Sequence, residues 1–213
     1  MEIKELESII KEDEIEIYFQ LHRNLENERI VGAECLSRRV LKTGEIQAPD
    51  KFIPYFEKYG MIVEYDEYIL KKVCKHIKEI NRADLKFFVN LSGKTFMDSK
   101  IIDKIILDIM ESKINLNSIG IELTETINLE DKDQINVSKN IKKFVDMGIV
   151  VAMDDFGQGS ATLEMLRKCP VQIIKIDRSF IKNKDEKSDK LLKALLTMCN
   201  FLELTTVAEG IET

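Results

Sequence analysis

Carboxylate side chains recur directly after short runs of β-branched and aromatic residues in this sequence. Glu122 stands near the end of one such run, and Glu209 directly follows another. Asp154 and Asp155 together follow a third run, so one of them could bridge two metal ions while the other binds a single ion. Carboxylate oxygens suit Mg²⁺ and Mn²⁺, and two such ions about 4 Å apart can clamp the attacking and leaving oxygens of a phosphoryl displacement. The pattern therefore predicts metal-assisted chemistry on a phosphate ester.

Three further polar residues stand at the same point of other β-rich runs, namely Glu34, Asn90 and Lys175. Crowded carboxylates repel one another and would bind protons unless cations neutralise them. Lys175 could orient an attacking water or offset phosphate charge. Each of these residues alone is more often a solvated loop residue, and Asn90 or Asp154 could simply cap a turn or a helix. Their recurrence at the same end of successive runs is what indicates a site.

The composition limits the metals and partners that suit such a site. The chain has only two histidines and four widely spaced cysteines, which argues against a zinc site and favours oxygen ligands. The formal net charge of −6 argues against polymeric nucleic acid as a partner. A small phosphate ester remains compatible with an acidic protein, because a divalent cation can supply the positive charge.

The hydropathy and the N-terminal residues give an expectation for the location. No long apolar run occurs, so no membrane segment is expected in this chain. The first residues, MEIKELESIIKEDE, are acidic and lack the basic-then-apolar order of a signal peptide. We therefore expect a cytoplasmic protein.

The elements that must position these residues alternate between strands and helices. Strands are expected near 86–91, 118–123, 149–153, 171–176 and 205–208, and helices over 102–110, 132–147, 160–168 and 187–202. The repeat of about thirty residues is that of a βα unit, which predicts a parallel sheet. The periodicity leaves open whether the sheet is doubly wound or closes into a barrel. In a barrel, all the strand ends meet on one face.

The first eighty residues follow a different pattern. We expect a leading helix over 2–12 within the segment 1–14, two strands at 16–21 and 29–36 joined by a hairpin connection, a helix between Pro49 and Gly60, and another over 63–80. No linker rich in Gly, Pro or Ser divides the chain, so residues 1–213 are expected to form one domain.

One short motif points to a different class of enzyme. Asp155-Phe156-Gly157 matches the D-F-G of protein kinases. The kinase set also requires a glycine-rich loop and an upstream H-R-D, and the sequence contains neither. We therefore reject the interpretation of this chain as a protein kinase.

At the residues above, the chain resembles the EAL family of cyclic di-GMP phosphodiesterases. The naming motif, Glu-Ala-Leu-x-Arg, is represented by Glu34-Cys35-Leu36-Ser37-Arg38. Six other segments resemble family motifs in the same order: YFQL (18–21), VNLS (89–92), IELTE (121–125), DDFGQG (154–159), KIDRSF (175–180) and AEGIET (208–213). Seven ordered motifs, covering the chain from about residue 16 to its end, make the resemblance specific.

The resemblance implies an α/β fold, a (β/α)8 TIM-like barrel of EAL type with irregular pairing of its early strands. It also implies two ions, Mg²⁺ or Mn²⁺, in each site. The first would be held by Glu34, Asn90, Glu122 and Asp154, and the second by Asp154, Asp155 and Glu209. Lys175 would position the nucleophilic water together with these ligands, and Glu125 would brace the loop that begins at Asp154.

The resemblance also implies a substrate and partners. The family reaction cleaves one phosphodiester bond of cyclic di-GMP to give linear pGpG. Gln20, Leu36, Arg38 and Asp177 would contact this substrate, and Arg38 suits a bidentate contact with a phosphate. We expect a homodimer paired through the helices beside the DDFG strand. We also expect fused sensory or cyclase domains in a longer parent protein.

The chain departs from the family pattern in three places. Cys35 replaces Ala and Leu21 replaces Pro, and neither change removes a ligand. The family continues past the AEGVET segment, so this fold is expected to be truncated before its last strand and helix, leaving strand 205–208 as an open edge. Two alternatives to a hydrolase therefore stay open: a cyclic di-GMP receptor with weak or no catalysis, and a protein-interaction module.

Overall fold

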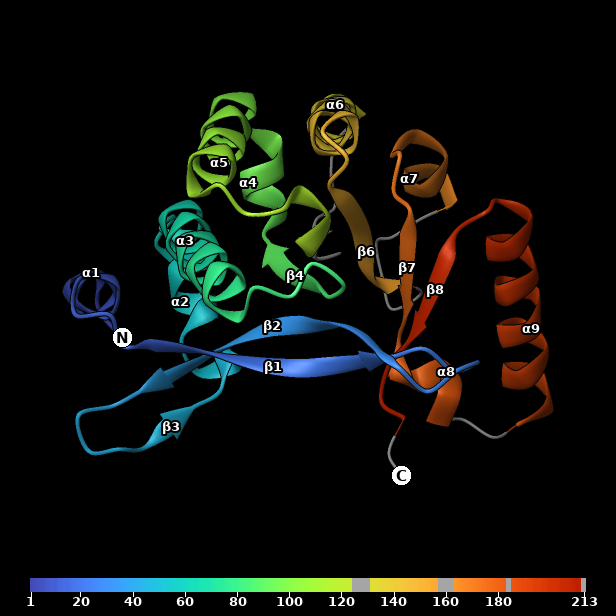
Figure 1. The fold of residues 1–213 in the computed structure, drawn as a ribbon, viewed down its shortest axis with the longest axis horizontal. Helices are drawn as coiled ribbons and strands as arrows, with labels where there is room; N and C mark the ends of the chain where they lie inside the picture. Colours follow the sequence, from blue (N-terminus) through green and yellow to red (C-terminus); the bar gives the residue numbers. More distant parts are fainter. Residues whose placement is uncertain (124–130, 157–162, 183–184, 212–213) are drawn as a thin grey trace.

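The computed structural model describes residues 1–123, 131–156, 163–182 and 185–211, apart from the side chains of 131 and 132. Within these ranges, a single curled sheet of eight strands carries helices along its outer side (Figure 1). The strands are β1 (Ile15–Arg23), β2 (Ile30–Val40), β3 (Ile46–Gln47), β4 (Lys86–Leu91), β5 (Ile119–Leu123), β6 (Val150–Phe156), β7 (Ile173–Ile176) and β8 (Thr205–Ala208).

The strand order follows the chain. Neighbouring strands run β1-β2-β4-β5-β6-β7-β8, with the two-residue β3 paired to β2 outside this path. β1 and β3 are antiparallel to β2, and every later pair is parallel. A doubly wound sheet would reverse its order at a switch point, so the sequential order excludes that alternative. The curled, half-barrel sheet confirms the predicted TIM-like architecture with an irregular start.

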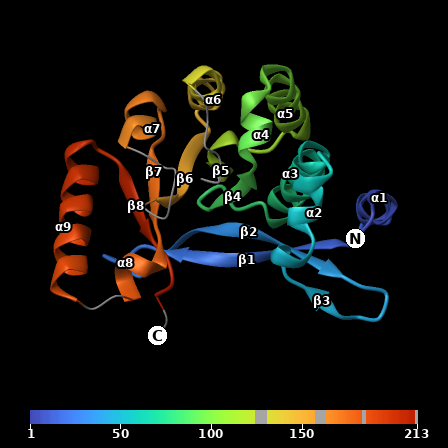
Figure 2. The same ribbon diagram turned by 180° about the vertical axis from the view of Figure 1, so that it is seen from behind.

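Most of the helices lie along the convex side of this sheet, as both views show (Figures 1 and 2). The described helices are α1 (Ile3–Lys11), α2 (Ile53–Lys58), α3 (Ile62–Ile80), α4 (Gly93–Met97), α5 (Ser99–Ser112), α6 (Asp131–Asp146), α7 (Leu163–Lys168), α8 (Arg178–Lys182) and α9 (Glu186–Phe201), with short 3-10 turns at Pro49–Lys51 and Leu116–Ser118. Among the described helices, no segment has the length and apolar character needed to span a membrane.

The core lies between the helices and the convex face of the sheet. Val89, Ile121 and Val151 pair in register across β4, β5 and β6 and are fully buried. Phe96 of α4 and Phe144 of α6 are fully buried and pack edge to face against each other. Successive side chains of a strand alternate between its two faces. The residues directly before and after each of these buried residues in its strand therefore point to the concave face.

Most of the expected elements are present, with bounds shifted by a few residues. The expected helix 102–110 begins earlier, at Ser99, because the Asp98 carboxylate accepts the backbone N–H groups of Lys100 and Ile101. Side-chain caps of this kind satisfy donors that the first helical turn leaves unpaired. The strand at 149–153 extends through Phe156. The first part of the helix expected at 160–168 lies outside the described residues, and the described part starts at Leu163.

Candidate metal centre

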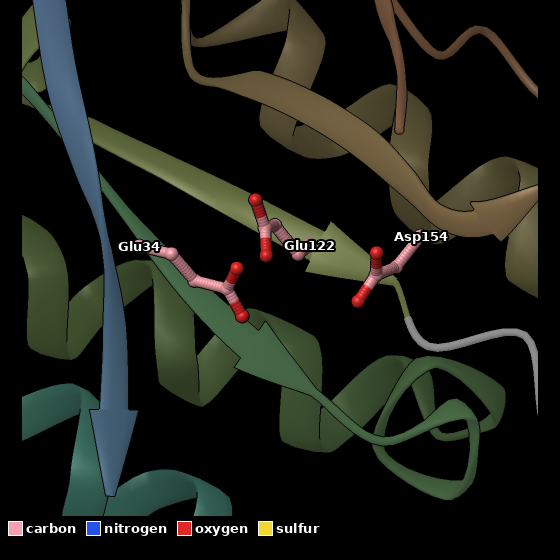
Figure 3. Close-up of side chains that lie close together, drawn as sticks. All are labelled: Glu34, Glu122 and Asp154. Carbon is pink, nitrogen blue, oxygen red and sulfur yellow. The ribbon is translucent and has the colours of Figure 1, made fainter. Parts of the chain in front are cut away.

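Lys175 lies at the centre of the side chains that converge on the concave side of the sheet. Its Nζ atom is 2.8 Å from Glu34 Oε2, 2.9 Å from Glu122 Oε2 and 3.0 Å from Asp154 Oδ1. Glu209, directly after β8, places its Oε1 atom 2.8 Å away. Figure 3 shows the carboxylates of Glu34, Glu122 and Asp154 directed toward one another from three strands. The Lys175 side chain is only 1% exposed, so its charge is held inside the protein.

The register of the parallel sheet explains why these residues meet. Asn90 and Glu122 are paired across β4 and β5, one position after the buried pair Val89 and Ile121. Alternation along each strand therefore directs Asn90 and Glu122 away from the helices. The Nδ2 atom of Asn90 then donates a hydrogen bond of 2.7 Å to Glu34 Oε1 on β2. Residues from strands far apart in the sequence thus meet on the concave face of the sheet.

The pairing of β6 is irregular at the two adjacent aspartates. Met153 pairs with Ile174 and Phe156 pairs with Ile176, so β6 contains one residue more than β7 over this stretch. Asp155 has a left-handed backbone, with φ of 50°, and its N–H donates to Asp154 Oδ1 at 2.9 Å. Adjacent side chains in a regular strand point to opposite faces, and a bulge redirects them. The bulge therefore lets both carboxylates reach the same site.

The carboxylate oxygens form two groups that share Asp154. One oxygen from each of Glu34, Glu122 and Asp154 lies within 4.8 Å of the others, and the same limit holds for Asp154, Asp155 and Glu209. Asn90 adjoins the first group through its bond to Glu34. The structure thus brings together the six residues that the resemblance implied as metal ligands.

Burial perturbs the ionisation of this cluster. Burial raises the pKa of Glu122 to about 8, and the nearby carboxylates of Glu34 and Asp154 add to this effect against the opposing charge of Lys175. Burial also raises the pKa of Glu209. Burial by itself would lower the pKa of Lys175, but the surrounding carboxylates outweigh it and raise this pKa. The cluster therefore favours additional positive charge.

Two buried oxygen atoms test whether a cation fits here. Asn90 Oδ1 and Glu122 Oε1 are inaccessible to solvent and have no hydrogen-bond partner among the described residues. A buried acceptor without a partner carries a desolvation cost. Glu122 belongs to the first carboxylate group and Asn90 is bonded to Glu34 of that group, and both oxygens are of the kind that Mg²⁺ and Mn²⁺ prefer as ligands. The residues present therefore fit a divalent cation.

The residues expected to contact a substrate lie mainly on β1 and β2. Gln20 pairs with Glu34 across these antiparallel strands, so both side chains point to the same face of the sheet. Leu36 and Arg38 follow Glu34 on that face at alternate positions. Arg38 lies over the Tyr18 ring, 5.7 Å from its centroid, and donates to the Ser37 carbonyl at 2.7 Å. These side chains extend the concave face beyond the carboxylate cluster.

Two other expected site residues differ in their surroundings. Asp177 is buried, and its Oδ1 atom accepts the N–H of Ser179 at 2.7 Å at the start of α8. It therefore has a structural role at the β7–α8 junction, while contact with a substrate stays a prediction. Glu125 lies outside the described residues, so its proposed bracing of the following loop also stays a prediction.

Sequence reasoning missed the residues beneath the carboxylates. His22 is two residues from Gln20 on β1, and its ring lies 5.4 Å from the Phe88 ring. Phe88 in turn covers Gly120, where a Cβ atom would come within 2.5 Å of the ring. Burial lowers the pKa of His22, and the Lys175 charge adds to this effect. The alternation that places Gln20 on the concave face could have identified His22 as well.

Comparison with known proteins points to one family. A model of the EAL domain matches residues 3–213. Among curated proteins, the chain is similar to the signaling protein YkoW of Bacillus subtilis, at 28% identity over 97% of this chain and 26% of that protein. It is also similar to the cyclic di-GMP phosphodiesterase NbdA of Pseudomonas aeruginosa, at 26% identity over 99% of this chain and 27% of that protein. The chain thus spans about a quarter of the length of these relatives.

A solved structure extends the similarity to three dimensions. The chain matches the PaMucR phosphodiesterase in complex with c-di-GMP with a TM-score of 0.87 at 26% identity. The match covers 99% of this chain and 87% of that chain. The curled sheet and its outer helices are therefore shared with a phosphodiesterase structure.

Proposed function

Because this chain belongs to the EAL domain family, we propose that it hydrolyses one phosphodiester bond of cyclic di-GMP to give linear pGpG. The observation that carries this proposal is the convergence of carboxylates from separate strands around the buried Lys175. The naming of NbdA as a cyclic di-GMP phosphodiesterase and the c-di-GMP complex of PaMucR support the choice of substrate. A cytoplasmic location follows as part of the same proposal.

The proposed cofactors are two ions of Mg²⁺ or Mn²⁺. Glu34, Asn90, Glu122 and Asp154 would hold one ion, and Asp154, Asp155 and Glu209 would hold the other, in keeping with the two carboxylate groups. Such ions supply Lewis-acid stabilisation of the negative charge that develops on phosphoryl oxygens.

The side chains of the chain itself would bind and orient the reactants. The reaction adds one water across a P–O bond: a new P–O bond forms, the old one breaks, and the leaving oxygen gains a proton. Lys175, with its ammonium fixed by surrounding carboxylates, would orient the attacking water. Arg38 would bind a phosphate through its fork of N–H donors, and Gln20 and Leu36 beside it would contact the nucleotide.

The first test is hydrolysis by the purified chain. We expect pGpG to form from cyclic di-GMP with Mn²⁺ or Mg²⁺ and to stop with a chelator. Glu34→Ala should lower kcat by more than about 100-fold, because even the loss of an outer-shell partner of a metal ligand typically costs 10–100-fold. Glu45→Ala, at an exposed carboxylate in the β2–β3 turn, is the matched control and should keep wild-type activity.

The same samples distinguish the alternative functions. Cyclic di-GMP that binds tightly and is recovered intact, with no turnover across metals and pH, would replace the hydrolase with a receptor. The absence of any binding heat with the dinucleotide would instead favour a protein-interaction module. Either result would overturn the proposed reaction.

A further inference from the structure

A buried carboxylate outside the metal-ligand set connects α3 to the end of β4. Asp66 is 3% exposed and lies in the first half of α3. Its Oδ2 atom accepts two hydrogen bonds, from the Ser92 N–H at 2.8 Å and from the Thr95 hydroxyl at 2.6 Å. A single oxygen thus fixes both a backbone group and a side chain in the segment that leaves the sheet.

The segment held by Asp66 forms a tight turn between strand and helix. Ser92 caps α4, because its hydroxyl accepts the N–H of Thr95 at 3.3 Å. The two hydroxyl oxygens also lie 3.1 Å apart. With Asp66, these contacts hold the first turn of α4 at a defined distance from α3. A buried polar network of this kind rigidifies the backbone that carries it.

Asn90 is only two residues before this turn. Leu91, the residue between Asn90 and Ser92, is fully buried on the opposite face of β4. Asn90 Nδ2 donates to Glu34, while its buried Oδ1 has no partner among the described residues. The direction of that oxygen therefore depends on the backbone at the end of β4, which the Asp66 bonds anchor.

We propose that Asp66 is a positioning residue of the candidate metal centre. It holds the β4–α4 turn so that the side-chain oxygen Oδ1 of Asn90 is directed toward the first carboxylate group. This inference rests on the proposed function. Asp66 does not touch the site itself, so its effect passes through Asn90. Outer-shell partners that orient metal ligands typically change metal affinity 10–100-fold when they are lost.

Two substitutions separate the hydrogen bonds from the charge. Asp66→Asn keeps one side-chain oxygen, and one oxygen accepts both bonds in the present structure. Asp66→Ala removes them. We expect Asp66→Ala to weaken Mn²⁺ binding, measured by calorimetry, by roughly 10-fold or more, and Asp66→Asn to stay within about threefold of wild type. A cavity variant at the other end of α3, Ile77→Ala, should lower the Tm without changing Mn²⁺ affinity.

A double-mutant cycle with Asn90→Ala tests the route of the effect. If Asp66 acts through Asn90, Asp66→Ala should weaken Mn²⁺ binding much less in the Asn90→Ala background than in the wild type, because coupled residues are non-additive. Additive losses would overturn the proposal. So would an Asp66→Ala protein with a reduced Tm but wild-type affinity for Mn²⁺.

A readout without metal keeps this inference separate from the proposed function. In ¹⁵N-labelled protein, the Asn90 side-chain amide signal should shift in Asp66→Ala and stay unchanged in Ile77→Ala. A wild-type chain that binds no Mn²⁺ would contradict the proposed function, and the amide signal would still decide whether Asp66 positions Asn90. An unchanged signal in Asp66→Ala would refute the positioning role.

Discussion

The Lys175 ammonium illustrates how charge is balanced at the scale of single residues. It has three protons but lies within 3.0 Å of four carboxylate oxygens. Burial raises the pKa of Glu122 to about 8, and the carboxylates of Glu34 and Asp154 add to the rise because the single charge of Lys175 does not offset them all. Additional cations would remove this imbalance, and the unpartnered oxygens of Asn90 and Glu122 give them ligands.

Asp66 gives a prediction for the pH dependence of stability. Burial raises the pKa of Asp66 to about 6 from an ordinary value of 3.8, although its bonds to Thr95 and Ser92 oppose the rise. The folded protein therefore holds this proton more tightly than the unfolded chain. The contribution of Asp66 to stability is fully present below pH 3.8 and is lost as pH rises through about 6. The difference corresponds to about 3 kcal/mol.

Asp66→Asn should remove this contribution to the pH dependence. We expect the free energy of unfolding of the wild type, relative to the variant, to fall between pH 4 and pH 6.5. Urea unfolding at several pH values measures it, and the comparison cancels the titration of all other groups. Parallel curves for the two proteins would show that the pKa of Asp66 is not raised.

At the scale of elements, Arg39 adds a charged contact between the first helix and the sheet, beside the buried side chains of Leu6 and Ile9. Arg39 on β2 has a side chain that is 7% exposed, and its guanidinium contacts Glu14 at 2.8 Å and Glu5 of α1 at 2.9 Å. Glu14 is nearly buried, whereas Glu5 is 44% exposed. Removing one partner of a buried pair leaves an uncompensated charge. Most of the stability lost on removal of the Arg39 side chain should therefore come from the uncompensated charge of Glu14.

The contacts of Arg39 with Glu5 and Glu14 give a prediction about α1. Arg39→Ala should lower the free energy of unfolding by about 2 kcal/mol, less than for a fully buried pair because of the exposure of Glu5. Chemical unfolding measures the change, and hydrogen exchange should show faster opening of α1. Lys42→Ala is the control, since the Lys42–Glu12 pair is on the surface and such pairs contribute little. Equal losses in the free energy of unfolding for the two substitutions would contradict this role of Arg39.

At the scale of the whole molecule, exposed apolar side chains beside β6 bear on the expected homodimer. Ile135 on α6 is 51% exposed, and Leu163 at the start of α7 is 65% exposed. Both helices adjoin the strand that carries Asp154 and Asp155 (Figure 1). The homodimer predicted from the sequence would place these two side chains at its contact.

We therefore predict a dimer that Ile135→Glu and Leu163→Glu together convert to a monomer, because charged side chains would have to be buried at the contact. Sedimentation velocity at several concentrations measures the change. Leu107→Glu, at an exposed position on α5, is the control and should leave the dimer intact. A wild-type monomer at high concentration would exclude this assembly.

Fused domains in a longer parent protein stay a prediction consistent with the greater length of the relatives.

The sequence by itself determined the parallel sheet and the identity of the converging carboxylates. Alternation along a strand is a local rule, so Asn90 and Glu122 could be assigned to the strand ends from the apolar residues before them. Long helices such as α3 and α9 also have enough turns to show their periodicity. By contrast, α4 and α8 have only five residues each, too few for an apolar period, and were not predicted.

Tertiary structure alone decided how those residues meet. The bulge in β6 depends on pairing with β7, so the local sequence predicted that Asp154 and Asp155 share a site but did not show how both reach it. The fourfold contact of Lys175 and the bonds of Asp66 to the β4–α4 turn join residues far apart in the chain. Their geometry, and the pKa values that follow from it, depend on burial and distance, which exist only once the sheet has curled and the helices have packed.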